Sequence, residues 1–275
     1  MAKEKENEMN IKLENSKILK VLIETLSNII DETVLKITPN ELVIKAMDPS
    51  RICLLKIRMA KFDFDEFDCK GEISIGLNLD DLNKILKRSG KDDSIELSFK
   101  ENSQKLKIQF AREKRKRTFS LSVLDLDIEE IPMDNLLTID YETEWKMNLE
   151  ILVEAIKDAE IYSELINIKV IENQGIIFSS IGQIGEMEYS LEVDDLIENN
   201  IYGESEGAFS TDFLKKIFKL SSIIETFTIS AKTDNPLRID FEFLEGGVLN
   251  YFLAPRIDSD VDVEELEELE EIEVE

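Results

Sequence analysis

Hydrophobic and polar residues alternate along this chain with two different periods, helical in four segments and strand-like in the stretches between them. In the first segment Ile18, Leu22, Leu26 and Ile29 recur at helical spacing, and Ser16 stands at the capping position. The pattern predicts helices over residues 16–30, 80–89, 148–160 and 211–222, and strands over residues 42–47, 52–59, 72–77, 94–99, 105–111, 117–123, 165–171, 175–181, 186–193, 226–232, 236–243 and 248–254.

The pattern of the first half recurs in the second half at an almost constant offset. KILK at 84–87 matches KIFK at 216–219, and IELSF at 95–99 matches FTISA at 227–231, in both cases 132 residues apart. A register of this kind predicts a tandem duplication, and hence an α+β fold of two similar domains. We therefore expect function to lie in something that repeated units build, such as a curved surface or a ring.

The domain limits follow from shifts in composition. Residues 125–135, DLDIEEIPMDN, are acidic, contain a proline and show no sustained period, which is typical of a linker. We expect a flexible leader at 1–8, a first domain at 9–123, a linker at 124–135, a second domain at 136–257 and an acidic disordered tail at 258–275.

The chain lacks most of the residues that carry chemistry. It has no histidine, which excludes Ser-His and Cys-His nucleophilic catalysis and most transition-metal sites. Cys53 and Cys69 are the only cysteines; they are too few for an ordinary structural zinc site and are expected in the core. We predict a protein that is not an enzyme and has no metal or cofactor.

The charge is strongly negative but uneven. The net charge is −27; the tail holds eleven acids and no base, and residues 9–257 carry −15. An overall field of this sign does not attract nucleic acid. No apolar run is long enough to span a bilayer, and the first nine residues, MAKEKENEM, do not resemble a signal peptide. We expect a cytoplasmic protein, associated with the nucleoid in a prokaryote and nuclear in a eukaryote, that does not bind membranes.

Basic residues nevertheless form a stripe on two of the predicted helices. Lys84, Lys87 and Arg88 lie on one helical face, and Lys215 and Lys219 repeat that stripe in the second half. Such a stripe is typical of a solvated amphipathic helix. If equivalent helices line one concave face, however, their lysines converge on it and could contact the phosphates of a duplex without recognising its bases.

Four motifs resemble the proliferating cell nuclear antigen (PCNA) family, the sliding clamps of archaea and eukaryotes. They are KAMDPSRICLLKI at 45–57, LNLDDLNKILKRSG at 77–90, LDLDIEEIP at 124–132 and NYFLAPRI at 250–257. The resemblance implies a DNA-clamp fold, with antiparallel sheets outside and helices inside, that assembles into a homo- or heterotrimeric ring around duplex DNA. It also implies that DNA polymerase, the clamp loader, ligase and nuclease dock on the ring through short peptide motifs.

The resemblance further implies a set of DNA-facing residues, to which spacing adds neighbours. The family pattern gives Lys20, Lys84, Lys87, Lys157 and Lys219, and spacing adds Lys17, Arg88, Lys215 and Lys216. Helix 148–160 departs from the family because it is acidic, and Glu154 and Asp212 stand where the family often has bases. This departure makes the contribution of the second domain unequal to that of the first.

A partner-docking groove is the next implication. Arg51 stands where eukaryotic members usually have a histidine. The groove set is Met47, Arg51, Ile52, Leu54, Ile131, Pro132, Pro236, Phe252, Leu253, Ala254 and Pro255. Plain core packing is the alternative explanation for an apolar set of this kind, for Leu54 and Leu253 above all.

Opposite charges mark two expected sheet edges. The basic run is Arg112, Lys114, Arg115, Lys116 and Arg117, and the acidic edge at 185–195 includes Glu186 and Glu188. The family places both at subunit boundaries, and such edges suit head-to-tail closure into a ring. The alternative for the basic run is a nucleic-acid patch.

Two other functions compete with the clamp. A non-ring acidic adaptor would bind partner peptides through the groove alone. A magnesium-dependent enzyme would rest on the carboxylate pairs Asp125/Asp127 and Asp194/Asp195, which lie in linker-like or edge-like segments and would have to converge in three dimensions.

Overall fold

The same order of elements occurs twice along the chain in the structure, a computed structural model that describes residues 7–126, 131 and 133–256. Residues 1–6 of the expected leader, 127–130 and Pro132 of the linker, and the tail from residue 257 lie outside the described residues. The first half contains β1 (Glu8–Leu13), α1 (Lys17–Ser27), β2 (Glu32–Ile37), β3 (Glu41–Met47), β4 (Cys53–Ala60), η1 (Lys61–Asp63), β5 (Glu66–Lys70), β6 (Ile73–Asn78), α2 (Leu79–Leu86), β7 (Ser94–Lys100), β8 (Lys105–Arg112) and β9 (Arg115–Ser122).

The second half repeats this plan after a short helix in the linker region. It contains α3 (Asp134–Leu137), β10 (Thr143–Asn148), α4 (Leu149–Ala159), β11 (Leu165–Ile171), β12 (Gly175–Gly182), β13 (Gly185–Glu192), η2 (Val193–Asp195), β14 (Glu198–Ile201), β15 (Ser205–Ser210), α5 (Thr211–Lys215), η3 (Phe218–Ser222), β16 (Thr226–Ala231), β17 (Leu237–Phe243) and β18 (Gly247–Leu253).

The helices follow from the apolar periodicity, with two differences from the prediction. In α2 the Asn78 side chain accepts a hydrogen bond from the Asp81 backbone N–H at 3.0 Å, so Asn78 is the cap rather than Asp80. The single helix predicted over 211–222 is instead α5 followed by the 3₁₀ turn η3. Ser221 and Ser222 donate their hydroxyls to the carbonyls three residues earlier, at 2.8 and 2.9 Å, and such local bonds favour the tighter turn.

Three antiparallel sheets organise the described residues. A five-stranded sheet has the order β5-β1-β7-β8-β9, and a four-stranded sheet has the order β13-β12-β11-β15. A nine-stranded sheet, β14-β10-β16-β17-β18-β4-β3-β2-β6, spans both halves. The two halves join where β18, the last strand of the chain, pairs with β4 of the first half.

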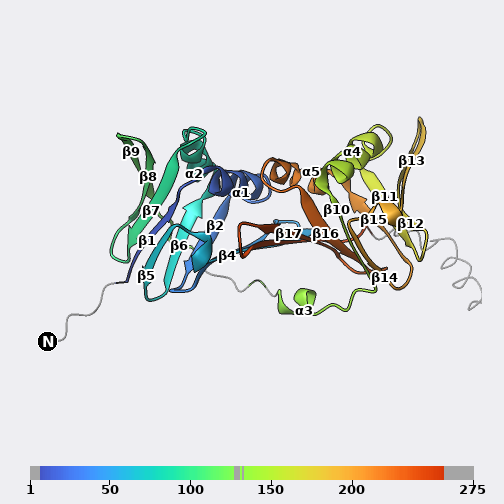
Figure 1. The fold of residues 1–275 in the computed structure, drawn as a ribbon, viewed down its shortest axis with the longest axis horizontal. Coiled ribbons are helices and arrows are strands. Elements are labelled where there is room, and N and C mark those ends of the chain that lie inside the picture. Colours follow the sequence, from blue (N-terminus) through green and yellow to red (C-terminus); the bar gives the residue numbers. More distant parts are fainter. Residues whose placement is uncertain (1–6, 127–130, 132, 257–275) are drawn as a thin grey trace, which may run out of the picture.

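Figure 1 shows the layers that result. The helices α1, α2, α4 and α5 lie along one side of an arched molecule, and the sheets lie behind and beneath them. Side chains that alternate along the strands fill the space between the two layers, and they include Trp145, Phe227 and Tyr251, each at most 1% exposed. The predicted arrangement of helices on one face and sheets on the other is thus observed.

Candidate functional site

The helical side of the molecule carries the predicted basic stripe. Lys84 and Lys87 of α2 are exposed, as is Arg88 directly after it, and Lys157 is the one exposed base on α4. The remaining members of the set are exposed (Lys17, Lys219) or half-buried (Lys20, Lys215, Lys216). The stripe therefore continues across both halves, but it is richer in bases on the first.

Two lysines from different halves converge at the centre of this side. The Nζ of Lys87 lies 4.0 Å and the Nζ of Lys219 lies 3.8 Å from the same Oε1 of Glu24 on α1. Lys17 at the start of α1 donates to the backbone carbonyl of Ser222 in η3. The helical sides of the two halves thus form one continuous surface at their junction.

Some members of the stripe already have partners within the chain. The Asp81 carboxylate, 2.9 Å from Lys84, raises the pKa of that lysine. Asp212 and Glu160 both pair with Lys215 and raise its pKa. These lysines remain charged at neutral pH, but nearby acids offset part of their field.

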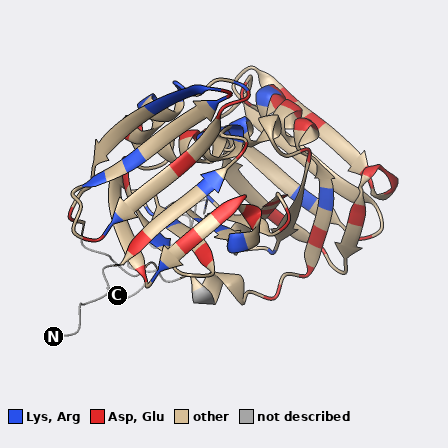
Figure 2. Ribbon diagram, turned by 60° about the vertical axis from the view of Figure 1, so that its left-hand side comes forward, with Lys and Arg blue, Asp and Glu red and all other residues tan. Residues whose placement is uncertain are grey.

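The free edges of two sheets carry the predicted opposite charges. β9 ends the five-stranded sheet and β13 ends the four-stranded sheet, so in the described chain each has one side without a strand partner. Figure 2 shows the basic run as a continuous blue segment along an outer strand. Lys114, Arg115 and Lys116 are exposed, and so are Glu186 and Glu188 on β13.

Two residues of the basic run are engaged within their own domain. Arg117 pairs with the buried Asp93 and also donates to the carbonyl of Arg88 at 2.8 Å. Arg112 lies 3.2 Å from Asp92. The prediction that all five bases serve as edge charges is therefore corrected for these two, because their charges are already matched by neighbouring acids.

The junction between the halves shows how such edges pair. β4 and β13 begin at Cys53 and Gly185, and the turns η1 and η2 that follow them begin at Lys61 and Val193, each pair 132 residues apart. β4 and β13 are therefore equivalent strands of the repeat, and so are β9 and β18. Since β18 pairs with β4 inside the chain, β9 and β13 are the two members of this kind of junction that remain unpaired.

The apolar groove set gathers only in part. Leu54 and Phe252 are cross-strand partners that form a separate small cluster with Met133, and the half-buried Met47 and Ile131 pack against it. Sequence reasoning missed Met133, Leu136 and Leu137 of α3, although their apolar spacing in MDNLL carries a weak helical signal. The cluster lies on the face of the nine-stranded sheet opposite the main core.

Other members of the groove set lie elsewhere. Leu253 was predicted to line the groove, but alternation along β18 turns it to the other face, where it is fully buried in the main core. Ile52, Pro236, Ala254 and Pro255 are half-buried around the cluster. Pro132 is outside the described residues.

A tight loop places Arg51 beside this cluster. Asp48, 3% exposed, accepts backbone hydrogen bonds from Ser50 at 3.0 Å and Cys53 at 2.5 Å. Arg51 adopts a left-handed backbone conformation with φ of 60° and is exposed. Asp48 therefore holds the loop, and the Arg51 side chain projects from it.

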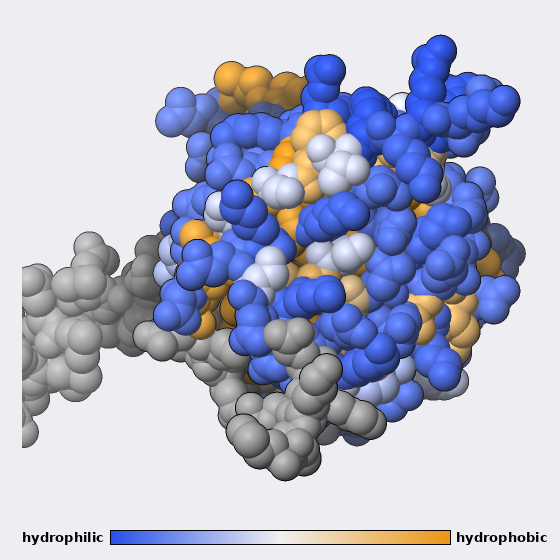
Figure 3. Space-filling view, turned by 90° about the vertical axis from the view of Figure 1, so that its left-hand side faces the viewer, coloured by the Kyte–Doolittle hydropathy of each residue, from blue (hydrophilic) through white to orange (hydrophobic). Residues whose placement is uncertain are grey.

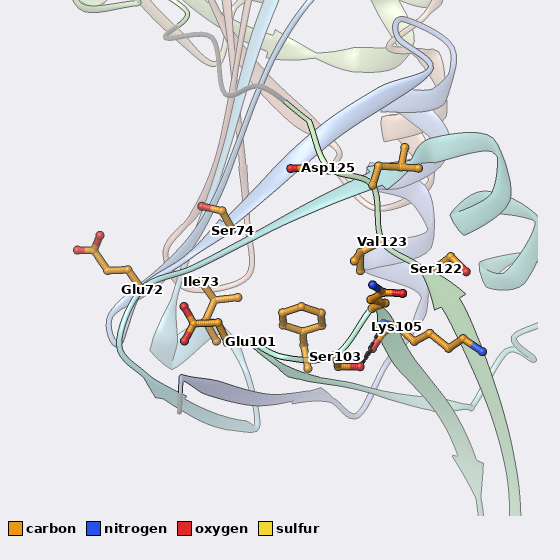
Figure 4. A pocket seen from close by; sticks show the side chains of 12 residues that line it. Glu72, Ile73, Ser74, Glu101, Ser103, Lys105, Ser122, Val123 and Asp125 are labelled. Carbon is orange, nitrogen blue, oxygen red and sulfur yellow. Dashed lines mark hydrogen bonds between the residues drawn. The ribbon is translucent and has the colours of Figure 1, made fainter. Parts of the chain in front are cut away.

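A pocket of about 780 Å³ lies near the start of the linker. Its walls come from the start of β6, the β7–β8 turn and the end of β9, and Figure 4 shows Glu72 and Lys105 extending in opposite directions. Within the described chain no three His, Cys, Asp or Glu side chains gather as a metal site requires. Asp194 and Asp195 of the enzyme hypothesis are both exposed, and Asp127 lies outside the described residues. Over the described ranges, no helix combines the length and apolar character needed to cross a membrane.

Comparisons with known proteins agree over nearly the whole chain. Sequence profiles of the N-terminal and C-terminal domains of proliferating cell nuclear antigen match residues 8–132 and 135–256. The chain is 31% identical over 240 residues to a DNA polymerase sliding clamp of Thermococcus sibiricus, covering 86% of this chain and 94% of that protein. It is 30% identical over 251 residues to a DNA polymerase sliding clamp of Pyrococcus horikoshii, covering 90% and 98%. The crystal structure of PCNA from Thermococcus kodakaraensis has a similar fold, with a TM-score of 0.84 at 22% identity, covering 90% of this chain and 100% of that one.

Proposed function

This chain belongs to the proliferating cell nuclear antigen family, and we propose that it is a DNA sliding clamp, a ring around duplex DNA that tethers DNA polymerase and other replication and repair enzymes. The observation that carries this proposal is the pair of unpaired, oppositely charged edges, β9 and β13. They are equivalent to two strands that already pair inside the chain.

The internal junction supplies a register for closure between copies. In β18·β4, Tyr251 faces Leu55 and Asn250 faces Lys56. A shift of both strands by the repeat offset pairs Phe119 of one copy with Met187 of the next, and Thr118 with Glu188. On this register Lys116 faces Ser190, with Glu188 as a diagonal neighbour, close enough for long side chains to interact.

Surface character supports closure by strand pairing together with a small apolar contact. Figure 3 looks onto the end of the molecule that holds the first domain and shows a largely hydrophilic surface crossed by a narrow strip of apolar and weakly polar side chains. At the other end Ile161, Ile181 and Ile184 are 60%, 73% and 74% exposed. An exposed edge strand is an aggregation risk for a single chain, and ring closure removes it.

The ring would place the helical surface around DNA. Lys84, Lys87 and Arg88, with Lys219 and Lys157 from the second domain, would contact phosphates without sequence preference. The acidic residues of α4 make the second domain the weaker contact. Because the rest of the chain is acidic, positive potential is confined to this face.

The apolar cluster around Met47, Leu54 and Phe252 would receive partner peptides on the outside of the ring, among them those of the clamp loader, a ligase and a nuclease. On this account the chain tethers its partners and catalyses no reaction, and it works where the chromosome is. The two edges are complementary to each other, which favours a homotrimer over a heterotrimer with related subunits.

Primer extension on primed circular single-stranded DNA, with a clamp loader and its cognate polymerase, tests this proposal. We expect product length per binding event to rise when the chain is added, and this effect to be lost in a variant that does not form a ring. The non-ring adaptor function would instead leave peptide binding intact in a chain that is monomeric and has no effect on product length.

A further inference from the structure

A second row of side chains borders the apolar cluster on the outer face of the nine-stranded sheet. Met47, Leu54 and Phe252 occupy one row across β3, β4 and β18. Two residues away along each strand, and therefore on the same face, a polar row begins. In it Lys45 of β3 faces Lys56 of β4, which faces Asn250 of β18, which in turn faces Asp240 of β17.

Lys45 and Lys56 form an unusual pair. They lie directly opposite each other on antiparallel strands, where Cβ atoms are about 4.5–5.5 Å apart and like charges are destabilising. Lys45 is exposed and Lys56 is half-buried. Neither forms an ion pair with any acid among residues 7–126, 131 and 133–256, so their repulsion is not offset within the described chain.

The other charges on this face are matched. Arg58 pairs with Glu41 at 2.6 Å. Asp240, the one acid of the polar row in these four strands, accepts a hydrogen bond from Asn250 at 2.7 Å and lies 2.8 Å from the Nε of Arg238. The lysine pair is therefore a local excess of positive charge on a chain whose net charge is −27.

We propose that Lys45 and Lys56 bind a carboxylate of the docked partner, so that the groove selects peptides with Asp or Glu next to their apolar anchors. This inference rests on the proposed docking function of the groove. An anion above the pair would offset the repulsion between the two ammonium groups and gain a charge-assisted contact with each.

Strand geometry sets where the carboxylate must lie. Successive side chains on one face of a strand are about 6.6 Å apart, so the lysine row begins one such step from Met47 and Leu54. A peptide that covers Met47 and the half-buried Ile131 with apolar side chains reaches the lysines with the next residues of its chain. A free carboxylate in solution lacks these anchors and gains little from the exposed lysines alone.

Fluorescence polarisation with the full chain tests the proposal. The probes are two labelled peptides with the same apolar and aromatic anchors, one with Glu and one with Gln in the flanking positions. Wild type should bind the Glu peptide about threefold to tenfold more tightly in low salt, and the difference should shrink as salt rises. The double variant Lys45→Gln, Lys56→Gln should lose this preference while binding the Gln peptide as wild type does. Lys107→Gln, which removes an exposed charge on β8, is the matched control and should keep it.

Three other outcomes would overturn the proposal. If the double variant keeps the preference for Glu, another surface recognises the carboxylate. If wild type shows no preference and the double variant unfolds at lower temperature, acids of the linker or tail occupy the lysines instead. If neither peptide binds wild type, the groove itself is not a docking site, which also rejects that part of the proposed function.

Discussion

Lys87 and Lys219 stand 132 residues apart in the sequence, yet their ammonium groups approach the same oxygen of Glu24, at 4.0 and 3.8 Å. Their separation equals the offset of the repeat, so the two lysines occupy equivalent places in the two domains. Glu24 is 21% exposed at its side chain and joins both of them at the centre of the helical surface. An acid in the middle of a proposed DNA-facing stripe offsets part of its positive charge.

Removal of that acid should strengthen DNA retention. In Glu24→Gln, Lys87 and Lys219 lose a competitor for phosphate, so the salt dependence of DNA binding should steepen by about 0.9 for each lysine that gains a phosphate contact. The charge reversals Lys87→Glu and Lys219→Glu should act in the opposite direction. Binding to a nicked circular duplex across a salt series measures both effects. Glu72→Gln, an equal change of charge at the pocket near the linker, is the control, and an equal gain from both variants would reject the role of Glu24.

Edge charge should control assembly. Lys116→Glu should weaken ring formation, since it opposes the acidic edge of the next subunit, and Glu188→Lys in the same chain should partly restore it. An exposed pair contributes only about 0–1 kcal/mol, so the single change should lower the association constant by severalfold rather than abolish it. Phe119→Ala should have the larger effect, through loss of apolar contact with Met187. Sedimentation velocity measures all three variants, and an unchanged oligomer in Phe119→Ala would mean that β9 is not at the interface.

Asp63 should stabilise the junction between the domains. This buried carboxylate accepts a hydrogen bond from the Ala60 N–H at 2.7 Å and, across the domain boundary, from Gly246 at 2.7 Å and Glu245 at 3.2 Å. Asp63→Ala leaves three backbone donors unpaired and should lower the free energy of unfolding by about 2–4 kcal/mol in denaturant titrations.

The repeat supplies the control for this change. Asp195 is 132 residues from Asp63, caps the equivalent turn, and is exposed, accepting only from Glu192 at 3.2 Å. Asp195→Ala should lower the free energy of unfolding by less than about 1 kcal/mol. Equal losses in the two variants would show that Asp63 acts only on its own turn.

Accessible residues of the groove should affect partner peptides without affecting the fold. Met47→Ala and Ile131→Ala should each weaken binding of a motif peptide by about 1–3 kcal/mol, the range for a buried aliphatic contact, with little dependence on salt. Leu54→Ala is less informative because Leu54 is already 7% exposed in the chain alone and should also lower stability. Calorimetry that finds wild-type affinity in both accessible variants would place the docking site elsewhere.

Cys53 should resist alkylation in the native state. Burial raises the pKa of its thiol to about 12, so at pH 8 almost none is present as the reactive thiolate. Burial also raises the pKa of the Cys69 thiol. Mass spectrometry after iodoacetamide treatment should find Cys53 unmodified in native protein and both cysteines modified in guanidinium. Rapid native modification of Cys53 at pH 8 would contradict its buried position.

The sequence was most informative where periodicity is strong. The helices at α1, α2 and α4 and the matching strands of the two halves follow from apolar spacing and from the constant offset, because each face must bury its apolar side. It was least informative where neighbours decide. The orientation of Leu253 depends on the pleat of β18, and the pairing of Arg117 depends on Asp93, which is 24 residues away. The opposed lysines at 45 and 56 become visible only with the β3·β4 register.

Native mass in solution tests the central claim, that the β9 and β13 edges close copies of this chain into a ring. Sedimentation equilibrium of the purified protein alone at micromolar concentration should give three times the chain mass of 31.7 kDa, with no larger species. A species of one chain mass across the accessible concentration range would contradict self-closure, and open-ended growth with concentration would contradict a ring.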